Sequence, residues 1–87
     1  MTDPLRILDE AIAADDDLQA EEAARSVGPL GDAALPTLLE WQAAPDRDRR
    51  WWAVRALTAV GTPRAVAALI AALEDPEPDV RACAVVG

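Results

Sequence analysis

The sequence of 87 residues contains no histidine, lysine, phenylalanine, tyrosine or asparagine, and only one cysteine and one serine. Without histidine, carboxylates are the main metal ligands left, and a serine or cysteine nucleophile has no imidazole base. The single cysteine, Cys83, has alanine and valine neighbours, which predict a small buried side chain rather than a reactive thiol. These absences predict a protein that is not an enzyme and that needs no cofactor.

The acidic residues do not match a metal site or an acid–base pair either. The run 15–17 has no glycine turn and no distal glutamate, so it is more typical of the start of a helix than of a calcium loop. The adjacent acids at 21–22 and 74–75 are interpreted as solvated helix surface or turn. No catalytic or metal-binding residue is therefore predicted.

Long apolar runs and a surplus of basic charge are also missing. No window approaches the roughly 18 apolar residues that span a membrane, and residues 1–4 lack the basic-then-apolar pattern of a signal peptide. The net charge is −8: residues 1–46 carry eleven acids and two arginines, whereas residues 47–87 carry five acids and six arginines. Because an acidic chain repels phosphate backbones, we expect no nucleic-acid partner. The missing membrane span and signal peptide predict a cytoplasmic protein that does not bind a membrane.

Small aliphatic side chains are what the sequence has in quantity. Hydrophobic residues make up 52% of the chain and aromatic residues 3%, and alanine both favours helix and lets helices approach closely. Cap and breaker signals separate stretches with helical apolar spacing, and no stretch alternates convincingly with period two. The pattern predicts an all-α chain with helices at about 4–14, 17–27, 33–43, 48–60, 64–74 and 78–87.

An internal repeat organises these helices. Residues 45–54 align without gaps with residues 76–85 at an offset of 31, and the same offset maps Leu38 onto Leu69. This length fits two helices of about ten residues with two turns. Units of this size bury their apolar faces against their neighbours, which predicts a single stacked domain over residues 1–87.

The repeat also carries a family likeness. Asp79-Val80-Arg81 followed by Ala84, and residues 50–57 followed by Val60-Gly61, resemble the first helix of HEAT-like repeats of the phycobilisome-lyase type. Residues 62–76 resemble the second helix of that repeat and its exit. The resemblance covers about residues 16–87. It implies an α-α superhelix, a right-handed solenoid of about three HEAT-like helical hairpins.

The last repeat is short. The helix expected at 78–87 stops where Ala56 stands in the preceding repeat. Two accounts fit: the chain is a piece of a longer solenoid, or its final helix is shortened. The first is favoured because no polar outer face closes the array, and further repeats of the parent chain are then candidate partners.

The resemblance implies a binding function. Such repeats occur in bilin-attachment proteins, accessory domains and scaffolds, and the second helix of each repeat lines the concave face. The leading hypothesis is a module that binds another protein on that face, and the alternative is a subunit or domain of a bilin (phycobiliprotein) lyase. An alanine floor with a few charges suits a partner helix. The candidate residues outside the apolar stripe are Thr37, Glu40, Arg64, Ala67, Ala71 and Glu74.

Trp51 is a further candidate for partner binding. On a helix whose core positions include Arg49, Ala53 and Leu57, Trp51 lies outside the buried stripe. Tryptophan is enriched at binding hot spots because its large ring buries much area with little loss of entropy. The alternative is that Trp51 packs on the preceding repeat.

Two arginines recur at the period of the repeat. Arg50 and Arg81 each lie two residues after an aspartate, Asp48 and Asp79. Recurrence favours a structural ladder, in which each arginine reaches an acid on the adjoining repeat through charge-assisted hydrogen bonds, over an anion-binding role.

Overall fold

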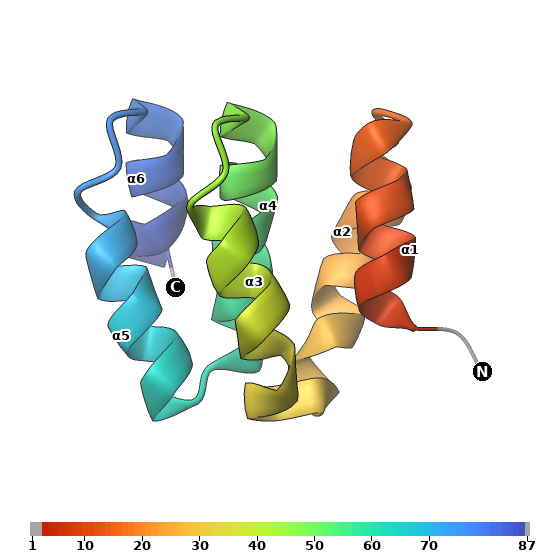
Figure 1. The fold of residues 1–87 in the computed structure, drawn as a ribbon, viewed down its shortest axis with the longest axis horizontal. Coiled ribbons are helices and arrows are strands. Elements are labelled where there is room, and N and C mark those ends of the chain that lie inside the picture. Colours follow the sequence, from red (N-terminus) through yellow and green to blue (C-terminus); the bar gives the residue numbers. More distant parts are fainter. Residues whose placement is uncertain (1–2, 87) are drawn as a thin grey trace.

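The computed structural model describes residues 3–86, apart from the side chain of Val86. Within that range the chain consists of helices and turns without a strand (Figure 1). This confirms the predicted all-α solenoid of short helical hairpins. The α-helices are α1 (Pro4–Ala13), α2 (Asp17–Val27), α3 (Leu35–Gln42), α4 (Arg47–Val60), α5 (Pro63–Ala72) and α6 (Pro78–Val86), and a 3₁₀ segment, η1 (Gly28–Ala34), joins α2 to α3.

Helix ends follow local capping chemistry. The side chains of Asp3, Asp16, Asp46 and Thr62 each accept a hydrogen bond from a backbone N–H in the first turn of the following helix. Such caps satisfy donors that the helix itself cannot pair. At the other end of α4, Gly61 takes the left-handed conformation, with φ of 63°, and ends the helix.

Two predicted helix boundaries differ from the structure by two residues. α3 begins at Leu35 rather than 33, because Gly31 has φ of 59° and breaks the backbone inside η1. Asp32 lies inside η1, and its carboxylate accepts a hydrogen bond from the Thr62 hydroxyl. α5 ends at Ala72 rather than 74, and the predicted end of the last helix at 87 lies outside the described residues.

The helices form two layers. In Figure 1, α1, α3 and α5 lie in front, and α2, α4 and α6 lie behind them. α4 is central, because it packs against α2, α3, α5 and α6. Among the described residues, those buried as a whole are all apolar, and each large one contributes about 1.5–3 kcal/mol relative to exposure. The largest fully buried side chains are Leu8, Val27, Leu38, Val54, Leu57 and Val80.

Position 49, predicted to lie in the core, carries a charged side chain that pairs with α1 and Trp41. Arg49 is only half-buried, and its Nη1 donates to Asp9 Oδ1 at 2.6 Å, which ties α4 to α1. Its guanidinium also lies 5.1 Å from the centroid of the Trp41 ring. A guanidinium cannot be buried without partners, so this position takes a carboxylate and a ring in place of an apolar contact.

Candidate interaction surfaces

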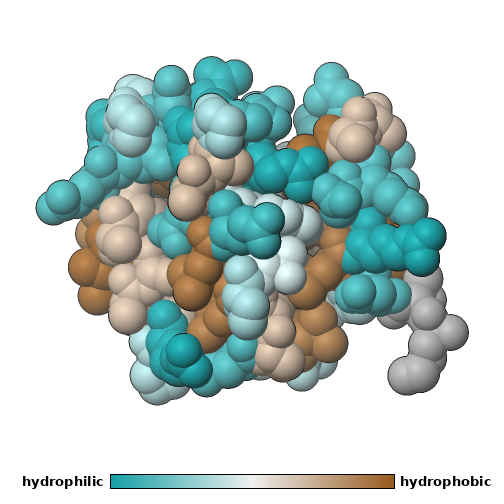
Figure 2. Space-filling model, viewed as in Figure 1, coloured by the Kyte–Doolittle hydropathy of each residue, from teal (hydrophilic) through white to brown (hydrophobic). Residues whose placement is uncertain are grey.

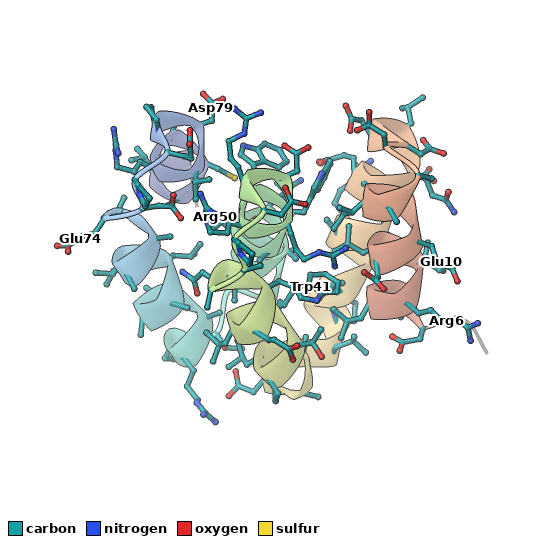
Figure 3. The ribbon with its side chains drawn as sticks, turned by 45° about the horizontal axis from the view of Figure 1, so that its top comes forward. Arg6, Glu10, Trp41, Arg50, Glu74 and Asp79 are labelled. Carbon is teal, nitrogen blue, oxygen red and sulfur yellow. The ribbon has the colours of Figure 1, made fainter. Side chains whose placement is uncertain are left out.

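The residues predicted to line a concave face lie on the outer surface of α3, α5 and the turn after α5, called the front face below. All are exposed except Thr37, which is half-buried. Arg64, Ala67 and Ala71 are three and four residues apart, so they share one stripe of α5. Glu74 points away from the helices (Figure 3). The front face is defined by Thr37, Glu40, Arg64, Ala67, Ala71 and Glu74.

A groove of about 280 Å³ runs between α3 and α5. Leu39 lines it from α3, and Ala71 and Glu74 line it from the other side. Gln42, also in the lining, donates through Nε2 to the carbonyl of Ala68 at 2.8 Å and so fixes the two helices together. Two of the six predicted residues, Ala71 and Glu74, thus line this groove.

The end of the array formed by α5 and α6 is apolar. Val66, Ile70, Leu73 and Val85 are all exposed there, and they border a groove of about 320 Å³. Figure 2 shows brown and pale-brown side chains gathered over α5, on the left, and teal ones along the upper edge. Contiguous exposed apolar surface is typical of interaction sites.

Arg50, on α4, joins the loop before α4 to the loop after α5. Its Nε donates to Asp75 Oδ2 at 3.0 Å, and its Nη1 donates to the carbonyls of Ala44 and Pro45 at 3.0 and 2.9 Å. The Arg50 and Asp75 side chains are only 14% and 8% exposed. The pair therefore fastens the α3–α4 loop to the α5–α6 loop with charge-assisted bonds largely shielded from water.

The other predicted members of the ladder are arranged differently. Arg81 Nη1 donates to the carbonyl of Asp75 at 2.7 Å, the repeat equivalent of the Arg50 bond to Ala44. Asp48 is exposed and lies 3.7 Å from Arg47. Asp79 is exposed at the start of α6 (Figure 3). The acid that Arg50 reaches is thus Asp75, at the exit of its own repeat rather than on the adjoining one, and neither Asp48 nor Asp79 takes part.

A pocket of about 430 Å³ lies at the N-terminal ends of α2, α4 and α6. The half-buried Trp51 and the buried Trp52 line it, with ring centroids 4.7 Å apart and planes at 81°. This cavity is called the Trp51 pocket below. Its remaining lining residues are charged: Asp15, Asp17, Glu21, Arg47, Asp48 and Asp79.

Cys83 is half-buried and packs against the core. The pKa of its thiol is raised, mainly by burial; the charge of Arg55 lowers this pKa, and the charge of Glu21 raises it. The thiolate, the nucleophilic form, is therefore disfavoured. In the described part of the chain, Cys, Asp and Glu side chains do not converge in any group of three able to hold a metal ion. None of the described helices is both long and apolar enough to cross a bilayer.

The fold and its open faces define a class of protein, an array of stacked helical hairpins with grooves between the helices. A family model described as HEAT repeats matches residues 4–86, and the chain belongs to the HEAT repeat family. Repeats of this family generally mediate protein–protein interaction or act as scaffolds. Searches of curated proteins and of solved structures found no match.

Sequence reasoning missed two features of these surfaces. No signal marked Asp75 as the partner of Arg50, because Ala44 occupies the equivalent place one repeat earlier. A signal did exist for the Trp51 pocket. Asp17, Asp48 and Asp79 recur at a spacing of 31, each in the first turn of its helix.

Proposed function

We propose that this chain is a protein-interaction module that binds a helix of a partner protein along the front face. The observation that carries the proposal is the exposed alanine strip of α5, Ala67 and Ala71, beside the α3–α5 groove. Small side chains let a partner backbone approach closely, and a shallow groove with Leu39, Ala71 and polar side chains in its lining suits an amphipathic helix. The family supports protein binding as the general role.

Charges at the two ends of the strip add orientation. Arg64 lies at the start of α5 and Glu74 beyond its end. In the described part of the chain neither side chain forms an ion pair. A bound helix with an acid facing Arg64 and a base facing Glu74 is therefore favoured over the reversed orientation.

The test is capture of a partner by the full chain and by two matched variants. Ala71→Arg places a long charged side chain in the groove, so we expect at least about tenfold weaker capture, since a partner would bury an unpaired charge. Ala82→Arg is the control, because Ala82 is also exposed but lies on α6 in the other layer. Both variants should melt like the parent, within about 0.5 kcal/mol.

The opposite pattern would contradict the proposal. If Ala71→Arg captures the partner normally while Trp51→Ala does not, the binding site lies on the α2, α4 and α6 layer instead. Stability measured on the same samples separates lost binding from lost folding.

The bilin-lyase alternative stays a prediction from the repeat type. Mixing the chain with a bilin and recording the absorbance spectrum distinguishes the two functions. A protein that handles the chromophore shifts the pigment bands, whereas the interaction module leaves them unchanged.

A further inference from the structure

We propose that the Trp51 pocket binds an arginine side chain from a basic segment of a partner protein. This second site goes beyond the front face, because Trp51 lies on α4, in the layer behind α3 and α5 (Figure 1).

The wall of the pocket is aromatic and held in place. Trp52 is buried, and Trp51 packs against the core while part of its ring remains accessible. The edge-to-face contact between the two rings fixes their orientation. The pocket therefore offers a preformed indole surface, which attracts a planar cation through its ring electrons.

The rim of the pocket is dominated by carboxylates. Five acidic side chains line it, against one guanidinium, that of Arg47. Glu21 is already neutralised, because Arg55 Nε and Nη2 both donate to its Oε1. Within residues 3–86, Asp17 and Asp79 form no ion pair. The open charge beside the indole is therefore negative, which complements a basic partner.

Three of these acids line the pocket from the first turns of three different helices. Asp17, Asp48 and Asp79 lie in the first turns of α2, α4 and α6. A first-turn acid is stabilised by the positive end of its helix. The three carboxylates are therefore gathered around the pocket before a cation enters.

The chain already contains an occupied version of this arrangement. Arg49 lies with its guanidinium 5.1 Å from the centroid of the Trp41 ring while donating to Asp9 at 2.6 Å. Figure 3 shows Trp41 on the side of α3 that faces α1. The Trp51 pocket combines the same two elements, an indole face and carboxylates, on an open surface. The internal site shows that this fold accommodates arginine between them.

The chemistry of the pocket favours arginine over other cations. A metal ion is disfavoured, because the described acidic side chains do not converge as a ligand group. A guanidinium stacks flat on an indole and donates to two carboxylates at once, whereas an ammonium is a compact point charge. The volume of about 430 Å³ lies within the usual range of about 300–1,000 Å³ for ligand pockets.

Arg47 makes the proposal testable in both directions. It lines the pocket as the one like charge that an incoming guanidinium meets, and it is 56% exposed. Its loss should therefore tighten binding, an effect that general damage to the fold cannot produce.

The probe is a short peptide of alternating glycine and arginine with blocked ends, titrated into the full chain. The readout is the indole N–H signal of Trp51 in NMR, assigned among the three tryptophans with Trp51→Phe. We expect a saturable shift of that signal with the arginine peptide and none with the peptide in which citrulline, neutral and of the same shape, replaces arginine.

Three variants give the expected order. Trp51→Ala should weaken binding by about tenfold or more. Asp79→Asn should weaken it by about two- to fivefold, and Arg47→Gln should strengthen it by a similar factor. Asp79 and Arg47 are exposed, so these two variants keep the fold even if Trp51→Ala does not.

Several results would overturn the assignment: no saturable shift, equal shifts with the citrulline peptide, or equal affinity across Asp79→Asn, Arg47→Gln and the parent. Equal binding of the matched lysine peptide would overturn the preference for arginine. Ala71→Arg should leave the peptide affinity unchanged, so that failure of this site and failure of the front face are read separately.

Discussion

The α3–α4 and α5–α6 hairpins carry the same apolar pattern, yet one is covered and the other is open. Val66 stands one repeat after Leu35, but it is 44% exposed whereas Leu35 is 2% exposed. In the same relation, Val85 is 73% exposed and Val54 is fully buried. α4 packs against both α5 and α6, and in the described range no further hairpin lies beyond these two helices (Figure 1).

The position of a residue in the repeat therefore predicts whether its side chain is apolar, but not whether that side chain is buried. An apolar side chain in register is prepared for burial, and a neighbouring unit decides whether burial occurs. We therefore propose that the open α5–α6 face takes a further hairpin of the same kind. Three predictions test the comparison.

The largest effect should come from placing the same charge at equivalent positions. Val54→Asp buries an unpaired carboxylate and should cost at least about 3 kcal/mol, most of the stability of so small a chain. Val85→Asp should change stability by no more than about 0.5 kcal/mol, since the side chain is exposed. Urea unfolding followed by circular dichroism measures both. Similar losses in the two variants would remove the contrast between the hairpins.

An intermediate loss of stability should distinguish Arg50 from Arg81, the two recurrent arginines. Arg50→Ala removes two carbonyl bonds and leaves the shielded Asp75 carboxylate without its charged partner, so we expect a loss of about 2–3 kcal/mol. Arg81→Ala removes one carbonyl bond and should cost about 1 kcal/mol. Arg47→Ala is the exposed control, with a change near zero. A loss for Arg81→Ala as large as that for Arg50→Ala would contradict the bridging role of Arg50.

The smallest effect should come from covering the open face. Copying residues 57–87 directly after Gly87 continues the repeat at its own offset of 31. Burial of Val66, Ile70 and Val85 should then raise the melting temperature by several degrees, as a gain of about 1 kcal/mol does in a small domain. The same extension carrying Val85→Asp at the original position is the control. An unchanged melting temperature would favour the account of a shortened final helix.

Much of the fold was predictable because its signals are local. The side-chain caps at Asp3 and Thr62, the proline at 63 and the glycine at 61 mark helix ends with little help from tertiary structure. The start of α3 was not predictable in the same way. Aspartate is a common helix cap, but the Asp32 carboxylate accepts a hydrogen bond from Thr62, 30 residues away in the chain.

The candidate surfaces were predictable only in part. The exposure of Ala67 and Ala71 follows from helical spacing. The Trp51 pocket depends on the placing of three helix starts next to one another, and the Arg50–Asp75 bond depends on the meeting of two loops. Tertiary packing creates both features, and no single stretch of sequence contains either.

Amide hydrogen exchange of the chain, free and bound to its captured partner, tests whether the partner binds on the front face. The front-face proposal predicts that binding slows exchange mainly in residues 35–42 and 63–72, because the partner helix covers α3 and α5 and suppresses their local opening. Residues 17–27 and 47–60 should change little. Slower exchange confined to α2, α4 and α6, with α3 and α5 unaffected, would contradict the account.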